Sequence, residues 1–214
     1  MPFLKDADKE HVKQHFENLD GKVKLIVFTQ EMECMYCQET RELMEEVASL
    51  SDKIDVEVYD FVQDKQKVEE YKIDKIPAVV VEGEKDYGVR FYGIPMGYEF
   101  MSLVEAISTV STEESNLSQN TQKELQKLKR PVHIQVFVTL TCPYCSQAVS
   151  LAHKLAIESD LITADMVESA EFPHLTQKYR VMAVPKIILN EEIQFEGALP
   201  ETLFVENVMK TQTT

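Results

Sequence analysis

The sequence has no tryptophan, only six glycines, and no run of about 18 apolar residues. With so little glycine and eight prolines, the chain is neither collagen-like nor of low complexity. Without a long apolar run, no membrane-spanning helix is expected. Residues 1–8 lack the apolar core of a secretory signal and become acidic at once, so we expect a cytoplasmic protein.

Basic residues are scarce as well. The 214 residues include 22 Lys and Arg against 37 Asp and Glu, which gives a net charge of −15. Such a surface repels phosphate backbones and anionic lipids, so neither nucleic acid nor a membrane is an expected partner. The 44% hydrophobic content is ordinary for a globular protein, and the length corresponds to one large domain or two small ones.

The four cysteines are too few to staple a small secreted scaffold, but their positions are informative. They form two Cys-x-x-Cys motifs, Cys34–Cys37 and Cys142–Cys145, which lie 108 positions apart. A branched residue followed by proline recurs with the same offset, as Ile76–Pro77 and Val184–Pro185. Chance is a poor explanation for several features in register, so the chain contains an internal repeat.

A polar segment separates the two repeats. Residues 111–120 are nearly free of apolar side chains and indicate a linker, which predicts domains at 1–111 and 112–214. The two halves carry net charges of −11 and −4. A capping box formed by Thr121 and Glu124 is expected to start the helix that follows the linker.

Both halves show the same order of predicted elements. The predicted helices outside the motifs cover about 5–19, 64–72 and 97–110, then 121–130, 172–179 and 200–210; the strands include 24–28, 54–59, 133–138 and 161–164. In each half a helix follows the cysteine motif, and a hairpin opens at the X-Pro dipeptide. Strand–helix–strand predicts a right-handed parallel crossover, and the hairpin adds antiparallel strands. The fold class is therefore α/β, with a mixed central sheet flanked by helices on both faces, built twice.

This pattern resembles the thioredoxin fold, in which a Cys-x-x-Cys motif follows the first core strand and a branched residue with proline comes about 40 positions later. The tetrapeptide Cys-Pro-Tyr-Cys at 142–145 matches the glutaredoxin active site. Two such units in one chain resemble the protein disulfide oxidoreductases, glutaredoxin-like proteins of bacteria and archaea, over essentially the whole chain. The resemblance implies two tandem thioredoxin-like folds. It also implies that Pro77 and Pro185 are cis and that each lies against its own cysteine pair.

The implied activity is thiol–disulfide exchange on protein disulfides. It needs no cofactor beyond the redox-active disulfides that join Cys34 to Cys37 and Cys142 to Cys145. The attacking species is a thiolate, which the N–H groups and dipole at a helix N-terminus favour. We therefore expect Cys34 and Cys142 at helix N-termini as nucleophiles. Cys37 and Cys145, one turn further on, are then placed to resolve the mixed disulfide.

Substrate contacts are expected beside each cysteine pair. A cis-proline exposes the neighbouring backbone, so the residue before it can pair with an extended substrate segment as a β-strand does. A tyrosine inside each motif either lines the same groove or packs at its rim. The predicted substrate-binding residues are Ile76, Pro77, Val184, Pro185, Tyr36 and Tyr144.

The two sites are predicted to differ in charge. Glu31, Glu33 and Glu39 flank Cys34, whereas the polar neighbours of Cys142 are neutral and the proline of its motif suits the first position of a helix. Because nearby carboxylates disfavour a thiolate, Cys142 is predicted to be the more acidic thiol and the dominant nucleophile.

One feature of thioredoxins is missing from the sequence. Thioredoxins carry a buried carboxylate on the strand before the motif, which takes the proton from the resolving thiol. Neither residues 25–28 nor residues 134–138 supply one. The proton acceptor is therefore unassigned.

Three classes of function are compatible with these patterns. The first is an enzyme that reduces, oxidises or isomerises protein disulfides. The second is an electron carrier between a thioredoxin reductase-like flavin donor and a peroxiredoxin acceptor, supported by a resemblance to the N-terminal tandem-thioredoxin part of flavin-dependent peroxiredoxin reductases. The third is a zinc-binding or redox-inert interaction module.

Spacing weighs against zinc. Zinc sites usually place two cysteine pairs about 15–20 residues apart, whereas 104 residues separate Cys37 from Cys142. Zinc also leaves the repeated proline unexplained, so no metal site is predicted. A last alternative is that the first pair is an inert remnant and only the second pair works.

Overall fold

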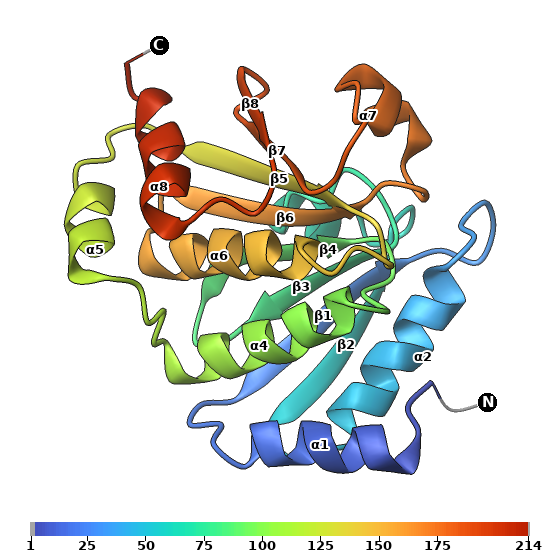
Figure 1. Cartoon of the computed structure of the whole chain (residues 1–214). Helices are drawn as coiled ribbons and strands as arrows, with labels where there is room; N and C mark the ends of the chain where they lie inside the picture. The colour runs from blue at the N-terminus through green and yellow to red at the C-terminus, as the bar shows by residue number, and fades with distance from the viewer. Residues whose placement is uncertain (1–2, 214) are drawn as a thin grey trace.

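The computed structural model describes residues 3–213, which form eight helices and one eight-stranded sheet (Figure 1). The elements of the first half are α1 (Asp6–Phe16), β1 (Val23–Thr29), α2 (Cys37–Ala48), β2 (Ile54–Asp60), α3 (Lys65–Glu70), β3 (Ala78–Glu82), β4 (Asp86–Tyr92) and α4 (Glu99–Thr112). Those of the second half are α5 (Gln119–Leu125), β5 (Val132–Val138), α6 (Cys145–Glu158), β6 (Ile162–Glu168), α7 (Pro173–Lys178), β7 (Lys186–Leu189), β8 (Ile193–Glu196) and α8 (Glu201–Lys210).

The strand order is β2-β1-β3-β4-β6-β5-β7-β8, so the order of the first four strands is repeated by the last four. In each half the first two strands pair in parallel, and the hairpin strands are antiparallel. The prediction of a mixed sheet built twice is confirmed.

The two sheets are joined into one, which the repeat alone did not indicate. Strand β4 pairs in parallel with β6, from Val89 opposite Ala164 to Tyr92 opposite Val167, which joins the halves into one sheet. This pairing satisfies backbone groups that an edge strand would leave open. Gly88 (φ +79°) permits the close approach, because a Cβ at this position would lie 2.8 Å from the carbonyl oxygen of Ile162.

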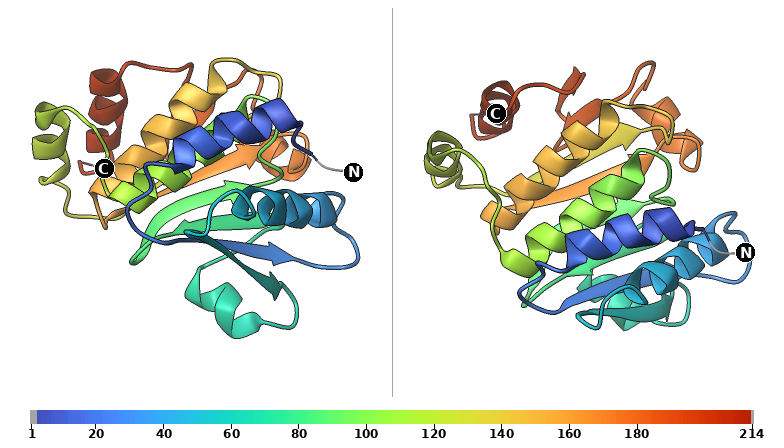
Figure 2. Two further views of the ribbon diagram at one scale, coloured as in Figure 1. Left: turned by 90° about the horizontal axis from the view of Figure 1, so that it is seen from below. Right: turned by 60° about the horizontal axis from the view of Figure 1, so that its bottom comes forward.

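The alternation of side chains along the strands determines the layers. In β1, Leu25 and Val27 point into one core, while Ile26 and Phe28 point into the other. Helices α1, α2, α4 and α6 cover the first face, and α3 lies on the opposite face (Figure 2). The first core runs continuously through both halves, so the two units share it.

The linker region differs in detail from the expectation. Helix α4 ends at Thr112, and α5 begins at Gln119 rather than at Thr121. Ser118 caps α5, since its hydroxyl accepts a hydrogen bond from the backbone N–H of Thr121 (3.2 Å). The predicted capping box is therefore replaced by a cap three residues earlier, and the domain boundary itself stays a prediction.

Within residues 3–213, no helix has both the length and the apolar character needed to cross a bilayer.

Candidate functional site

Both Cys-x-x-Cys motifs lie where a buried strand leads into a helix: after β1 and before α2, and after β5 and before α6. Each pair is closed in a disulfide with Cα atoms 5.5 Å apart. In each pair the first cysteine, Cys34 or Cys142, is half-buried, and the second, Cys37 or Cys145, is buried. An incoming sulfur can therefore approach the first cysteine, while the second is protected.

The helices begin later than predicted. Their first residues are Cys37 and Cys145, so Cys34 and Cys142 lie in the preceding turn, and the proline of the second motif is not in the helix. In the second motif, the N–H of Cys142 donates to Thr139 (3.0 Å), and its carbonyl accepts from Cys145 N–H (3.4 Å). The unsatisfied N–H groups of the first helical turn still lie next to the motif, where they favour a thiolate.

The X-Pro dipeptides Ile76–Pro77 and Val184–Pro185 are both cis, as predicted. In the second half, Cys142 Sγ lies 3.8 Å from the carbonyl oxygen of Val184, so this dipeptide faces its own cysteine pair. In each half a glycine after the hairpin donates its N–H to the proline carbonyl: Gly93 to Pro77 (2.9 Å) and Gly197 to Pro185 (2.8 Å). The X-Pro backbone and the glycine segment thus form one edge in each half, and in the second half this edge lies beside the disulfide.

The first site has an acidic surrounding. A groove of about 980 Å³ borders Cys34, and Arg41, the one basic residue among those lining it, is paired with Glu45 at 2.8 Å. The carboxylates that line this groove are Glu31, Glu39, Glu42, Glu45, Asp60 and Asp64. The prediction of an acidic environment for the first pair is confirmed and extends well beyond the flanking residues of the sequence.

Exposed apolar side chains surround both sites. Tyr36 and Tyr144, which precede the two helices, are 37% and 65% exposed. Three methionines that the sequence analysis did not single out are more exposed still: Met32 and Met35 beside the first pair, and Met182 two residues before Val184. Flexible apolar side chains at a redox site provide contact area for a polypeptide partner.

A buried carboxylate missed by the sequence analysis is Glu99, the first residue of α4. It is 0% exposed, and the Ser102 hydroxyl donates to its Oε2 (2.8 Å). Its Oε1 has no hydrogen-bond partner among residues 3–213. Burial raises the pKa of Glu99 from 4.5 to about 7.

Helix α4 packs against α6, and the ends at which the two helices begin lie on the same side of the molecule (Figure 1). Just before Glu99, the N–H of Tyr98 donates to the carbonyl of Leu140, two residues before Cys142 (3.1 Å). Further along, Glu105 accepts a hydrogen bond from Ser150 of α6 (2.6 Å). Along the first of these segments, Glu99 lies between the two contacts. Along the second, Cys142 and Cys145 lie between them.

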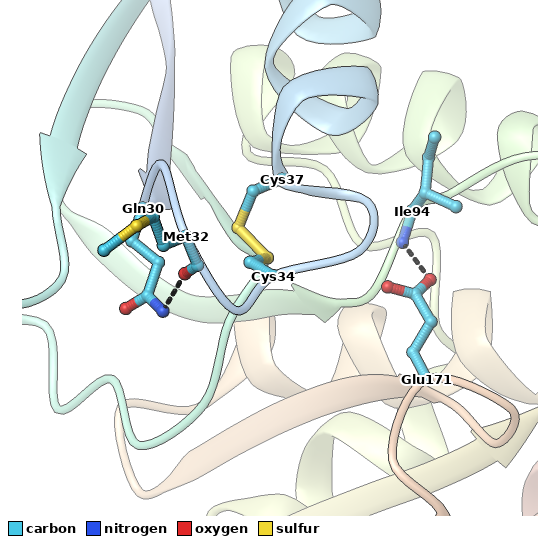
Figure 3. Close-up of a disulfide and its surroundings, with 6 residues drawn as sticks. All are labelled: Gln30, Met32, Cys34, Cys37, Ile94 and Glu171. Atoms are coloured by element: carbon cyan, nitrogen blue, oxygen red, sulfur yellow. Dashed lines mark hydrogen bonds between the residues drawn. A yellow bond between two sulfur atoms is a disulfide. The ribbon is translucent and has the colours of Figure 1, made fainter.

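A second half-buried carboxylate, Glu171, reaches from the second half to the first site (Figure 3). Its Oε1 accepts a hydrogen bond from the backbone N–H of Ile94 (2.7 Å). Burial, Glu168 and Glu39 together raise its pKa to about 7. Local sequence does not identify this residue, since the loop that carries it is 77 positions away from Ile94.

Within the part of the chain that the structure describes, no three His, Cys, Asp or Glu side chains converge as metal ligands would. The four cysteines are instead closed into their own pairs.

Comparison with known families places both motifs in one context. The profile of the family described as "Thioredoxin domain" matches residues 22–105 and 132–210, one segment for each motif. The chain belongs to the thioredoxin-domain family. The expected resemblance to tandem thioredoxin-like proteins is confirmed.

Two solved structures show the same tandem thioredoxin arrangement. A protein disulfide oxidoreductase from Aeropyrum pernix K1 is 31% identical, with a TM-score of 0.93 over 100% of this chain and 95% of that one. The N-terminal N/C domain of alkylhydroperoxide reductase AhpF from Enterococcus faecalis is 29% identical, with a TM-score of 0.89 over 95% and 99%.

Curated relatives of this thioredoxin-domain chain are longer. A Bacillus subtilis protein named NADH dehydrogenase is 32% identical over 70% of this chain. The F component of alkyl hydroperoxide reductase from Staphylococcus aureus is 29% identical over 86%. The matched regions span 27% and 33% of those two relatives.

Proposed function

We propose that this protein is a thiol–disulfide oxidoreductase that acts on protein disulfides and uses two Cys-x-x-Cys dithiol/disulfide sites. The observation that carries the proposal is the second site, where half-buried Cys142, paired with buried Cys145, lies 3.8 Å from the Val184 carbonyl. Reactive sulfur, resolving sulfur and a substrate-binding backbone are thereby brought together. The match to a protein disulfide oxidoreductase over the whole chain supports the same activity.

The reduction of a substrate proceeds in two exchanges. The Cys142 thiolate attacks a substrate disulfide, so the bond between Cys142 and one substrate sulfur forms while the substrate disulfide breaks, and the released thiolate takes a proton. Cys145 then loses its proton and attacks Cys142. The internal disulfide forms, the mixed disulfide breaks, and the second substrate thiolate leaves and is protonated. Two electrons have passed to the substrate, and a dithiol donor restores the enzyme.

Glu99 is the proposed proton acceptor for Cys145 in the second exchange. It is buried on the helix that packs against α6, and one of its oxygens is unpaired among the described residues. A pKa of about 7 lets the carboxylate take up and return a proton near neutral pH. The proposed base comes from the first unit, which would compensate for the missing carboxylate on the strand before the second motif.

Val184, next to Pro185, is proposed to pair with the backbone of an extended substrate. Ile76, next to Pro77, is its counterpart at the first site. The exposed tyrosines of the motifs contribute contact area beside them.

Insulin reduction with dithiothreitol as donor tests the function. Wild-type protein is expected to accelerate insulin precipitation, and the Cys34→Ser/Cys142→Ser double variant is expected to give the uncatalysed rate. Wild-type protein that reduces small disulfides yet leaves insulin at the uncatalysed rate would rule out protein disulfides as substrates.

A second candidate function is an electron carrier between a flavin-dependent reductase and a peroxiredoxin. It is favoured by the similarity to the N-terminal domain of AhpF from Enterococcus faecalis. The test is NADH oxidation in a mixture of a purified flavoprotein disulfide reductase, this protein and a peroxiredoxin with peroxide. Turnover that needs all components and exceeds insulin reduction would favour the carrier, whereas no transfer would remove it.

A further inference from the structure

The two sites have the same backbone arrangement of cis-proline and glycine, but different side chains lie over it. Gly93 and Gly197 both have φ +89°, and both donate to the carbonyl of their cis-proline. A Cβ on Gly93 would meet Glu171 Oε1 at 2.7 Å and Glu168 Cβ at 2.7 Å. At Gly197 no atom of the described residues lies within 4 Å of such a Cβ. The edge beside the first disulfide is covered, and the edge beside the second is open.

The cover comes from the join between the two halves. Because β4 and β6 run in parallel, the loop after β6 lies beside the segment after β4. Glu168 at the end of β6 accepts from the N–H of Glu171 (2.8 Å), which fixes the turn. The carboxylate of Glu171 then accepts the N–H of Ile94 beside the Cys34–Cys37 disulfide (Figure 3). Strand β8, the counterpart of β4, is an edge strand of the sheet and has no such neighbour on its outer side.

This cover competes with a polypeptide substrate. An extended chain that pairs with the backbone at Ile76 runs past the adjoining Gly93–Ile94 segment, which is hydrogen-bonded to Pro77. At this segment the substrate would meet the carboxylate of Glu171, which already accepts the hydrogen bond of the Ile94 N–H and fills the space over Gly93. A small disulfide needs only the sulfur of Cys34 and does not require this edge.

We propose that Glu171 is a specificity-determining residue of the first site. It closes the peptide-binding edge, so that the first pair exchanges with small disulfides and dithiols, while the second pair takes extended protein disulfides. This inference rests on the proposed oxidoreductase function and assigns different substrates to its two sites.

The test uses full-length single-site variants. Cys142→Ser/Cys145→Ser keeps only the first pair, and Cys34→Ser/Cys37→Ser keeps only the second. Each is combined with Glu171→Ala and assayed for kcat/KM with insulin and with 2-hydroxyethyl disulfide, with dithiothreitol as donor. The second-pair protein with and without Glu171→Ala is the matched control.

In the first-pair protein, Glu171→Ala is expected to raise kcat/KM for insulin about tenfold, as one or two recovered backbone hydrogen bonds would give. The kcat/KM for 2-hydroxyethyl disulfide is expected to change by no more than about twofold. Glu171→Gln keeps the size of the side chain and is expected to give a much smaller increase in kcat/KM for insulin. In the second-pair protein neither rate is expected to change.

An unchanged insulin rate in the first-pair Glu171→Ala protein would overturn the proposal, as would an equal gain with both substrates or in both single-site proteins. Glu171→Ser serves the same purpose if the alanine variant does not fold. Failure of the underlying function appears separately, as a second-pair protein that turns over the small disulfide but not insulin, and that result would overturn both.

Discussion

Replacing Glu99 by glutamine is expected to make the protein more stable and less active. The side chain is fully buried, so ionisation is disfavoured in the folded state, and its pKa rises from 4.5 to about 7. At 1.36 kcal/mol per pKa unit, this difference corresponds to about 3 kcal/mol. A raised carboxyl pKa adds stability that is fully present below pH 4.5 and is lost as the pH rises through 7.

The gain from Glu99→Gln therefore depends on pH. At pH 8 the free energy of unfolding of the variant is expected to exceed that of the wild type by about 3 kcal/mol, because the amide carries no buried charge. At pH 5 the difference is expected to be about 1 kcal/mol or less. For a chain of this size the larger value corresponds to a rise in Tm of about 6–12 °C. Because the chain has no tryptophan, unfolding in urea is best followed by far-UV circular dichroism. The comparison between pH 8 and pH 5 cancels any pH-independent cost of the amide.

Activity is expected to move in the opposite direction. Without a base at this position, insulin reduction at pH 7 falls by at least about tenfold, with its loss concentrated in the resolving step. Glu105→Gln in the same helix is the control: Lys154 (2.6 Å) and Ser150 (2.6 Å) hold the pKa of Glu105 below its usual value, so no gain at pH 8 is expected. Equal stabilisation at both pH values, or stabilisation with unchanged activity, would refute the role of Glu99.

Three further outcomes are expected. At pH 7, Cys142→Ser loses most insulin reductase activity and Cys34→Ser keeps more than half, because the carboxylates around Cys34 disfavour its thiolate; the reverse ranking would contradict this. In protein that keeps only the first pair, cationic cystamine is reduced about tenfold faster than anionic oxidised glutathione, and the preference shrinks in salt; equal rates at low salt would show that the acidic groove has no influence. Asp86→Asn is expected to lower the free energy of unfolding, measured in urea, by about 3 kcal/mol. The reason is that Arg90 is buried and donates two hydrogen bonds to the Asp86 carboxylate (2.7 and 2.5 Å). A loss below 1 kcal/mol, which is the loss expected for the same change at the exposed Asp160, would refute this prediction.

The repeated unit could be predicted because its determinants are local. Strand β1 alternates Leu25 and Val27 with Ile26 and Phe28, which is the pattern of a strand buried on both faces. The cysteine motif and the proline recur at a fixed offset, and each marks the same turn in both units. Helix starts were less well predicted, since Ser118 and Thr121 are both good capping residues and only the tertiary structure selects Ser118.

The join between the units was not predicted, although one residue indicated it. A glycine inside a strand often marks the close approach of another backbone, and Gly88 has that role opposite Ile162. The two glutamates with raised pKa values are a different case. Glu99 and Glu171 carry no local pattern that separates them from solvated acids, and the group that Glu171 binds, the N–H of Ile94, belongs to the other half of the chain.

The repeat runs in one direction along a single sheet, and this makes its two sites unequal. The first site has the second unit on its β4 side, where Glu171 covers the Gly93–Ile94 segment. The second site has the first unit against α6, where Glu99 of α4 is buried, and its own β8 edge stays free. A two-fold arrangement would give both sites the same neighbours. In this arrangement one site gains a carboxylate over its backbone edge and the other gains a buried carboxylate from the neighbouring helix, so two similar motifs have unequal surroundings.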